Sequence, residues 1–263
     1  METNGRDNGK LLAGAAAATA ALVGTAALAI VRVLSRVQPH FRFNTMFGHA
    51  CVFNVEDSAG RAVRMLAVDR SVQSGAYLGE HRFALPFEYY RAIERAVMAK
   101  GDAHEVLMLG GGAFAYPRFA LTAHEDMRMD VVEIDPAIVD IARRWFFLDE
   151  LEQRVGERLA IHTVDAHGFL EACTVRYDVI VNDLFAGFEM DAALLSDEGL
   201  ELMKAHLAEG GIYVVNAVSS PLDYQRLAET GELLERHFSS VKMVECTDAD
   251  FSDDENYLFV CRL

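Results

Sequence analysis

Residues 105–145 read EVLMLGGGAFAYPRFALTAHEDMRMDVVEIDPAIVDIARRW. The stretch opens as an apolar strand, turns on Gly110, Gly111 and Gly112, and continues into a second strand and a helix. With Ala115 the turn has the spacing G-x-G-x-x-A, in which glycine allows a tight turn and a close approach of a nucleotide or nucleoside. The spacing alone is a weak signal, and a tight connection between a strand and a helix is the alternative interpretation.

Acidic residues follow the next strands at their carboxyl ends. Glu133 comes 21 residues after Gly112 (133 − 112), where a carboxylate can accept hydrogen bonds from two ribose hydroxyls. Asp165 closes the third strand, where an acid receives the adenine amino group, and Asp183 closes the fourth. Ligands of open α/β sheets bind beyond the carboxyl ends of the strands, so Asp183 is expected at the reacting centre, with a loop cap as its alternative role. Asp135 is predicted to cap the helix that follows it.

Strands and helices alternate from residue 104 onward. The predicted strands are EVLMLG, MDVVEI, LAIHTV, YDVIVND, GIYVVNAV, VKMVE and NYLFVCR, and the predicted helices cover residues 117–124, 136–145, 166–172, 191–207 and 221–237. Strands that are apolar on both faces indicate a parallel sheet covered by helices on both sides. The short link DADFSDDEN should pair the last two strands antiparallel. This is typical of the Rossmann-like S-adenosylmethionine-dependent methyltransferase fold with a seven-stranded sheet, whereas an NAD-binding domain would continue with a second βαβ half.

The chain before the α/β region is predicted to hold further elements. Two β-rich runs, CVFNVED and RAVRMLAVDRSVQSG, flank a turn signal at residues 57–60 and predict a small N-terminal β-hairpin module. Helical spacing then predicts a helix over residues 87–100, ended by Gly101. We expect an N-terminal tail (1–10), a transmembrane anchor (11–34), the hairpin module (40–85) and a nucleoside-binding α/β domain (86–263).

Residues 11–31 read LLAGAAAATAALVGTAALAIV and carry no charge. At about 1.5 Å per residue the run would span about 30 Å, which is the thickness of a bilayer core. A single-pass membrane helix is therefore predicted. A cleaved signal peptide is the alternative, because Lys10 precedes the run and small residues end it, whereas an amphipathic soluble helix is disfavoured by the lack of a polar face. More basic residues follow the run than precede it, which favours a cytoplasmic α/β domain.

Composition excludes some classes of protein. The formal net charge of −16 argues against a nucleic-acid partner, which normally meets a basic face. An acidic field would attract a cationic substrate, although solubility explains the charge equally well. The four cysteines form no CxxC or CxxH pair, so no metal site is predicted.

In order and spacing these motifs resemble the spermidine synthase family of aminopropyltransferases, over roughly residues 43–263. AVDRSVQSG is similar to the family's LDGVVQS, MLGGG to its glycine loop, VVEIDPAIVDIAR to its VEID segment, VDAHGFL to GDG-x-x-F, and YDVIVNDLFAG to YDVIIVD. The resemblance is nearest to a divergent branch that is often membrane-associated. Members of the family often form dimers, so the resemblance is compatible with a homodimer.

The resemblance implies a chemistry. The donor, decarboxylated S-adenosylmethionine, is a sulfonium cation; an amine attacks its propyl carbon, and methylthioadenosine leaves. Asp183 matches the family's catalytic aspartate, which takes or relays the amine proton. Glu133 and Asp165 match the ribose and adenine acids. Gln73 matches the glutamine of the VQS segment, which is expected on the cofactor side, and Tyr89 matches a tyrosine on the substrate side.

The sequence departs from the family pattern at carboxylates that hold amines. Ala113 stands where the glycine loop of the family carries an acid, and Ala186 stands where a second acid follows the catalytic one. MFGHACVF replaces the usual N-terminal YQ pair. Glu189 and Asp191 in the following loop could compensate. The departures put putrescine in doubt as the acceptor.

Other functions stay open at this point. The missing acid at Ala113 weakens the preference for the decarboxylated donor, which keeps methyl transfer from S-adenosylmethionine as an alternative. A nucleoside-binding membrane protein without catalysis is a third hypothesis, and an NAD oxidoreductase is disfavoured by the terminal hairpin. His162 and His167 flank Asp165 and could supply a base, although surface or core histidines are more common. Phe185 and Phe188 could form a lid.

Overall fold

The computed structural model describes residues 41–69, 71–186, 189–190, 193–219, 224–248, 251 and 255–263. No helix within these ranges is long and apolar enough to cross a membrane. The predicted tail (1–10) and the predicted anchor (11–34) lie outside the described residues.

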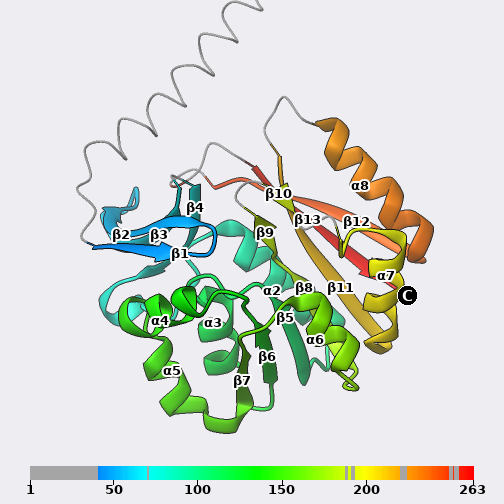
Figure 1. The fold of residues 1–263 in the computed structure, drawn as a ribbon, viewed down its shortest axis with the longest axis horizontal. Helices are drawn as coiled ribbons and strands as arrows, with labels where there is room; N and C mark the ends of the chain where they lie inside the picture. Colours follow the sequence, from blue (N-terminus) through cyan, green and yellow to red (C-terminus); the bar gives the residue numbers. More distant parts are fainter. Residues whose placement is uncertain are drawn as a thin grey trace, which may run out of the picture. The chain divides into compact units, whose positions relative to one another are not determined.

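A seven-stranded sheet lies at the centre of the α/β region (Figure 1). Its strands stand in the order β12-β13-β11-β8-β5-β6-β7. Their bounds are β5 (Glu105–Leu109), β6 (Arg128–Val132), β7 (Leu159–His162), β8 (Tyr177–Asn182), β11 (Leu207–Ser219), β12 (Ser240–Cys246) and β13 (Glu255–Arg262). The pairs β11–β8, β8–β5, β5–β6 and β6–β7 are parallel, whereas β13 is antiparallel to both β11 and β12. The predicted seven-stranded sheet with its terminal hairpin is therefore confirmed.

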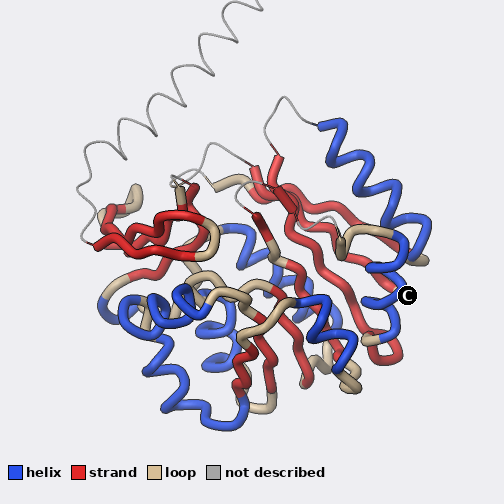
Figure 2. The backbone as a smooth tube through the Cα atoms, in the orientation of Figure 1, coloured by secondary structure: helices blue, strands red, loops and turns tan. Residues whose placement is uncertain are grey.

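Helices cover both faces of this sheet (Figure 2). They are α2 (Glu88–Lys100), α3 (Ala115–Ala123), α4 (Pro136–Trp145), α5 (Leu148–Val155), α6 (Ala166–Ala172), α7 (Asp197–Ala205) and α8 (Tyr224–His237). One apolar cluster joins the sheet to α6, α7 and α8, through side chains such as Leu170, Met203 and Leu234. The predicted bounds of α4 and α6 are correct, and α3 begins two residues before the predicted start.

One predicted helix needs correction, and one helix of the structure was not predicted. The helix predicted over residues 191–207 is shorter, since α7 begins at Asp197, where the Ser196 side chain caps it by accepting the N–H of Gly199. The short helix α5 was not predicted. It follows Phe147, which has a left-handed backbone (φ 60°), and it buries Leu148, Leu151 and Val155 along one side.

The N-terminal module is a four-stranded antiparallel sheet rather than a single hairpin. Its strands β1 (Phe41–Thr45), β2 (Gly48–Glu56), β3 (Ala62–Val68) and β4 (Ser71–Tyr77) pair in sequence order. The predicted run RAVRMLAVDRSVQSG reverses direction at Asp69, whose backbone is left-handed (φ 44°). The Asp69 carboxylate accepts the N–H of His49 at 2.9 Å, which ties this reversal to the start of β2.

A β-bulge interrupts the pairing of β3 with β4. Leu66 pairs with Ser74 and Ala67 pairs with Val72, so Gln73 is the extra residue between them. Bulges re-aim a side chain and are common beside functional sites. This one sits in the VQS segment that resembles the family motif.

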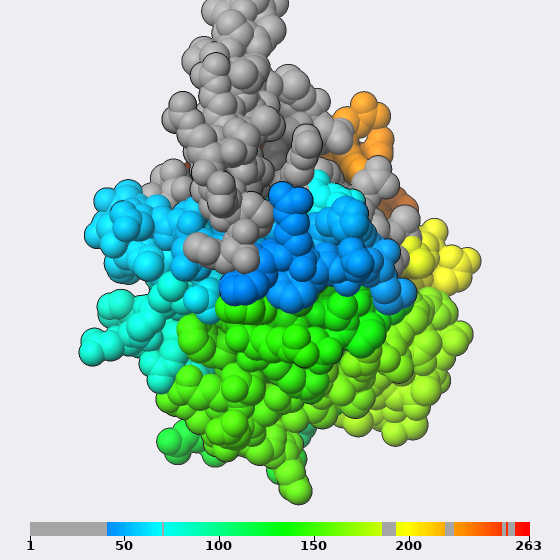
Figure 3. Space-filling view, turned by 60° about the vertical axis from the view of Figure 1, so that its left-hand side comes forward, coloured from blue at the N-terminus to red at the C-terminus, as the bar shows by residue number. Residues whose placement is uncertain are grey.

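The first sheet packs onto the α/β region. Side chains of β2 and β3 share an apolar cluster with Ala113, Ile138, Ile141 and Phe146. The backbone N–H of Met46, in the turn between β1 and β2, donates to Asp135 Oδ2 at 2.6 Å. Figure 3 shows the surface of the first sheet, in blue, directly against the green surface that includes α4.

Candidate functional site

The glycine turn brings the ends of β5 and β8 together. Gly110 and Gly112 have left-handed backbones, with φ of 94° and 50°. A Cβ atom on Gly110 would lie only 2.4 Å from the backbone oxygen of Asp183. The N–H of Asp183 donates to the carbonyl of Leu109 at 2.8 Å. Glycine is therefore required at position 110 both for the backbone conformation and for this close approach.

The Glu133 carboxylate accepts hydrogen bonds from the backbone of the glycine turn. Its Oε2 accepts the N–H groups of Gly111 and Gly112 at 3.0 and 3.2 Å, and its Oε1 accepts the N–H of Asp135 at 3.0 Å. Burial raises the pKa of Glu133 above its ordinary value, while the three N–H donors act in the opposite direction. Oε1 keeps a lone pair for one further donor. The binding of ribose hydroxyls by Glu133 stays a prediction. The structure shows in addition that Glu133 stabilises the glycine turn.

Glu133→Gln is expected to reduce the free energy of unfolding by about 1–3 kcal/mol, which is the cost of one unsatisfied buried group. Three N–H groups converge on two acceptor oxygens, and glutamine has only one acceptor oxygen. Its NH2 group would face an N–H donor. Urea unfolding of the protein without a nucleoside measures the effect. Glu157→Gln, at an exposed site, is the control and should change stability little. Equal stability of both variants would contradict the structural role.

Asp183 directly follows β8 at the carboxyl edge of the sheet. Its Oδ1 accepts a hydrogen bond from Asn216 Nδ2 at 2.7 Å, and Oδ2 has no hydrogen-bond partner among the described residues. Some of the residue remains exposed, but its carboxyl group is desolvated. Burial raises the pKa of Asp183 to about 7, and the charge of Glu133 adds to this, whereas the hydrogen bond from Asn216 opposes it. Within the described residues, Asp183 thus combines an oxygen free of hydrogen bonds with a pKa near neutrality.

The raised pKa makes stability depend on pH. The folded protein keeps a proton on Asp183 up to about pH 7, whereas the unfolded chain loses it near its ordinary pKa of 3.8. Stability should therefore fall as the pH rises from about 4 to about 7 and then level off. Asp183→Asn removes this dependence, so its melting temperature relative to the wild type should rise between pH 5 and pH 8. Thermal unfolding at both pH values measures this. A constant difference between the two proteins would contradict the shift.

Two tyrosines at the start of α2 line the same site. The rings of Tyr89 and Tyr90 lie 3.9 Å apart between centroids. Burial raises the pKa of both hydroxyls, and the charge of Asp183 raises it further. The Tyr90 hydroxyl is 2.9 Å from Ser74 Oγ, next to the bulged Gln73, and a Cβ atom on Gly112 would lie 3.5 Å from Ser74 Cβ. The start of α2, strand β4, the glycine turn and the end of β8 therefore meet.

Asp165 lies at the N-terminus of α6. Its Oδ1 accepts the N–H of Gly168 at 2.9 Å, so it caps this helix, and the residue is exposed. Adenine binding by Asp165 stays a prediction. Asp135 caps α4 as predicted, accepting the N–H of Ala137 at 2.9 Å.

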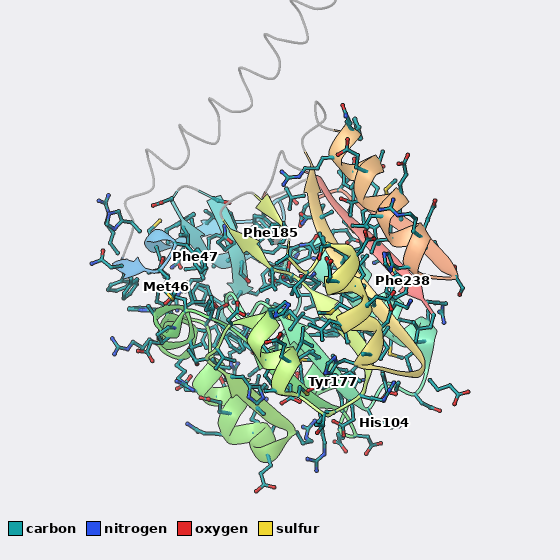
Figure 4. All side chains as sticks on the ribbon, turned by 45° about the vertical axis from the view of Figure 1, so that its right-hand side comes forward. Met46, Phe47, His104, Tyr177, Phe185 and Phe238 are labelled. Atoms are coloured by element: carbon teal, nitrogen blue, oxygen red, sulfur yellow. The ribbon has the colours of Figure 1, made fainter. Side chains whose placement is uncertain are left out.

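Each of the two predicted histidines lies beside a carboxylate. His162 contacts Asp130 at 2.6 Å and His167 lies 3.7 Å from Glu171. Phe185 is on the short strand β9 (Phe185–Ala186), which pairs with β10 (Glu189–Met190). Tyr177 is the first residue of β8, and Phe185 comes shortly after its end. Figure 4 shows these two residues at opposite ends of the sheet. Asp191, Phe188 and the side chains of Ala186 and Glu189 lie outside the described part of the structure.

Sequence reasoning missed several neighbours of Asp183. Asn216 donates to the carboxylate, and its own Oδ1 accepts from Asn256 Nδ2 at 2.9 Å. Ser74 and Tyr90 were missed as well. The one available signal was an asparagine in the apolar run IYVVNAV, since a buried amide requires partners.

Comparison with known proteins gives consistent matches. A family model described as the spermine/spermidine synthase domain matches residues 87–247. A polyamine aminopropyltransferase of Vibrio vulnificus is 26% identical over 162 residues, which cover 60% of this chain and 52% of that protein. Polyamine aminopropyltransferase 2 of Bacillus cereus is 30% identical over 151 residues, covering 55% and 41%. The chain spans about half or less of the length of the curated relatives it matches.

Solved structures share the fold. A probable spermidine synthase from Corynebacterium glutamicum has a TM-score of 0.69 at 25% identity, covering 84% of this chain and 79% of that one. A spermidine synthase in complex with the transition-state analogue AdoDATO has a TM-score of 0.69 at 14% identity, covering 86% and 73%. Human methyltransferase-like protein 13 in complex with SAH has a TM-score of 0.57 at 18% identity, covering 67% and 82%. The last two similarities show the fold alone.

Proposed function

Because this chain belongs to the spermine/spermidine synthase family, we propose that it transfers an aminopropyl group from decarboxylated S-adenosylmethionine to an amine and releases methylthioadenosine. One observation carries the proposal. Asp183 Oδ2 is free of hydrogen bonds within the described residues, Oδ1 is held by Asn216, and the pKa of the carboxyl group is about 7. This group stands beside the glycine turn, where the ends of two parallel strands meet.

The chemistry requires a base at this position. The acceptor amine has a pKa near 10 and arrives protonated. Asp183 Oδ2 takes its proton, and the freed lone pair attacks the propyl carbon bound to the sulfonium. The carbon–nitrogen bond forms as the carbon–sulfur bond breaks. The electron pair of the broken carbon–sulfur bond stays on sulfur and neutralises its positive charge. A carboxylate with a pKa of about 7 is about half ionised at neutral pH, and its ionised form accepts a proton efficiently.

The other predicted residues have binding roles in this proposal. The glycine turn cradles the nucleoside, Glu133 uses the free lone pair of Oε1 for the ribose, and Asp165 receives the adenine. Gln73, re-aimed by the bulge, also binds the donor, and Tyr89 flanks the acceptor. An aromatic face and nearby carboxylates both favour a cation.

A second candidate function differs from the first in the identity of the donor. Ala113 is fully buried within the apolar cluster that joins the first sheet to α4, so no carboxylate at this position can hold an amine. This favours methyl transfer from S-adenosylmethionine as the second candidate, and it makes an acceptor other than putrescine part of the main proposal.

The test uses the full-length protein in detergent. It is incubated with decarboxylated S-adenosylmethionine or S-adenosylmethionine and a panel of mono-, di- and polyamines, and the released thionucleoside is quantified. Amine-dependent methylthioadenosine supports aminopropyl transfer and identifies the acceptor. S-adenosylhomocysteine from the second donor supports methyl transfer. Tight nucleoside binding with neither product would contradict both and favour a binding protein.

The rate of transfer should depend on pH through Asp183. Below pH 7 the carboxylate is progressively protonated, so kcat/KM should fall about tenfold per pH unit. Above pH 7 this limb should be flat, because the base is already ionised. Initial rates between pH 5.5 and 8.5 at constant ionic strength measure the profile. A flat profile down to pH 5.5 would exclude Asp183 as the base.

We further propose that residues 11–34 anchor the chain as a single-pass helix, with the α/β domain in the cytoplasm, and that the protein forms a homodimer. The uncharged run at residues 11–31 supports the anchor. Retention in membranes after alkaline extraction, with an intact N-terminus by mass spectrometry, is expected. A mature chain that begins after residue 29 would indicate a signal peptide instead. Light scattering of the detergent-solubilised protein tests the dimer.

A further inference from the structure

Asn216 is a buried polar residue in the middle of an apolar strand. It lies on β11 with 3% of its surface exposed, between Val215 and Ala217, which are each 1% exposed. A buried side-chain amide costs free energy unless both of its ends are hydrogen-bonded. The partners of Asn216 therefore indicate why an amide is kept at this position.

The hydrogen bonds fix the orientation of the Asn216 amide. Its Nδ2 donates to Asp183 Oδ1 at 2.7 Å, and its Oδ1 accepts from Asn256 Nδ2 at 2.9 Å. An ionised carboxylate can only accept hydrogen bonds, so the NH2 group of Asn216 must face Asp183. Its carbonyl then faces β13, where Asn256 supplies the matching donor. The three side chains form a directed chain that ends on Asp183.

We propose that Asn216 is a positioning residue: it holds Asp183 by Oδ1 so that Oδ2 faces the substrate, and Asn256 in turn holds Asn216. The inference rests on the proposed role of Asp183 as the base. The backbone of Asp183 is fixed separately by its N–H bond to Leu109. Asn216 therefore controls the rotation of the carboxylate.

The same contact sets the charge state of Asp183. The titratable groups that face the carboxylate are Glu133, Tyr89 and Tyr90. Burial and the charge of Glu133 raise its pKa, and the donor from Asn216 lowers it. A hydrogen bond to the ionised form stabilises that form. Without Asn216 the pKa of Asp183 should rise, which would leave less of the base ionised at neutral pH.

The test measures the titration of Asp183 directly. Full-length protein labelled with 13C-aspartate is titrated by carbon NMR, and the Asp183 carboxyl signal is assigned by its loss in Asp183→Asn. In Asn216→Leu the pKa should rise by about one to two units, which corresponds to a charge-assisted hydrogen bond. Asn256→Ala should give a smaller rise. Tyr213→Phe is the matched control. Tyr213 lies on the same strand as Asn216, and its hydroxyl accepts a buried hydrogen bond from Asn182 Nδ2, which this variant removes. The Asp183 titration should be unchanged in it.

The outcomes separate this inference from the proposed function. The titration needs no turnover, so it decides the role of Asn216 even if no aminopropyl transfer is found. An unchanged pKa in folded Asn216→Leu, or a shift of equal size in Tyr213→Phe, overturns the inference. If Asn216→Leu does not fold, Asn256→Ala decides, with a rise supporting the inference and no change overturning it. Where transfer is active, the acid limb of kcat/KM should move with the measured pKa, and Asn216→Gln, which keeps the donor, should partly restore it.

Discussion

Asp183→Asn is expected to lower kcat by about 10²- to 10⁴-fold, the usual contribution of a general base. An asparagine at this position has the shape of the aspartate but cannot take the proton of the acceptor amine. Its amide oxygen can still accept the hydrogen bond from Asn216, so the site should keep its geometry. Binding of methylthioadenosine, measured by calorimetry, should therefore change little while the rate of its release falls.

Asp178→Asn provides the matched control at the opposite end of the same strand. Asp178 Oδ2 accepts the N–H groups of His104 and Glu105 at 2.9 and 3.0 Å, far from the carboxyl edge of the sheet. This variant should lose some stability and keep its kcat. A wild-type rate in Asp183→Asn would show that another group removes the proton. An equal loss of rate in both variants would point to a general structural defect.

Gly110→Ala is expected to destabilise the fold by about 2–5 kcal/mol. A left-handed backbone costs an alanine about 1–2 kcal/mol, and Gly110 has φ of 94°. Overpacking adds about 1–3 kcal/mol, because the new methyl group would lie 2.4 Å from the backbone oxygen of Asp183. This oxygen cannot move without shifting Asp183 itself. Denaturant unfolding measures the loss of stability, and nucleoside affinity should fall with it.

Gly60→Ala separates the two contributions. Gly60 also has a left-handed backbone, with φ of 75°, but a Cβ atom there would have no neighbour within 4 Å. Only the conformational cost of about 1–2 kcal/mol should remain. If both variants were equally stable, the close approach of the glycine turn to β8 would be excluded.

Much of the fold could be predicted because buried strands and helices leave recognisable apolar patterns in the sequence. The strands of the central sheet are continuous apolar runs, and α4 begins where Asp135 and Pro136 signal a helix start. The helix α5 has only two turns and was too short to show a clear period. The sequence of the four-stranded sheet reads as a single hairpin because the last reversal, between β3 and β4, uses a left-handed Asp69 rather than a glycine turn.

The site was predictable only where residues share an edge of the sheet. Gly110, Glu133 and Asp183 all follow parallel strands, and the rule for open sheets places them together. Asn216 comes 33 residues after Asp183, and Tyr90 comes 16 residues after Ser74, yet both pairs are in contact. Such contacts depend on strand register and on the packing of α2, which no local pattern reveals.

The packing of the first sheet against α4 limits how the chain can be shortened. The family match begins at residue 87, which suggests that the part after β4 is a self-sufficient module. Cutting there would uncover Ile138, Ile141 and Phe146 and would remove the Met46 N–H from Asp135. A protein truncated at this boundary should aggregate, because its newly exposed apolar surface has no cover. The smallest soluble unit for crystallisation or grafting should therefore begin at or before Phe41.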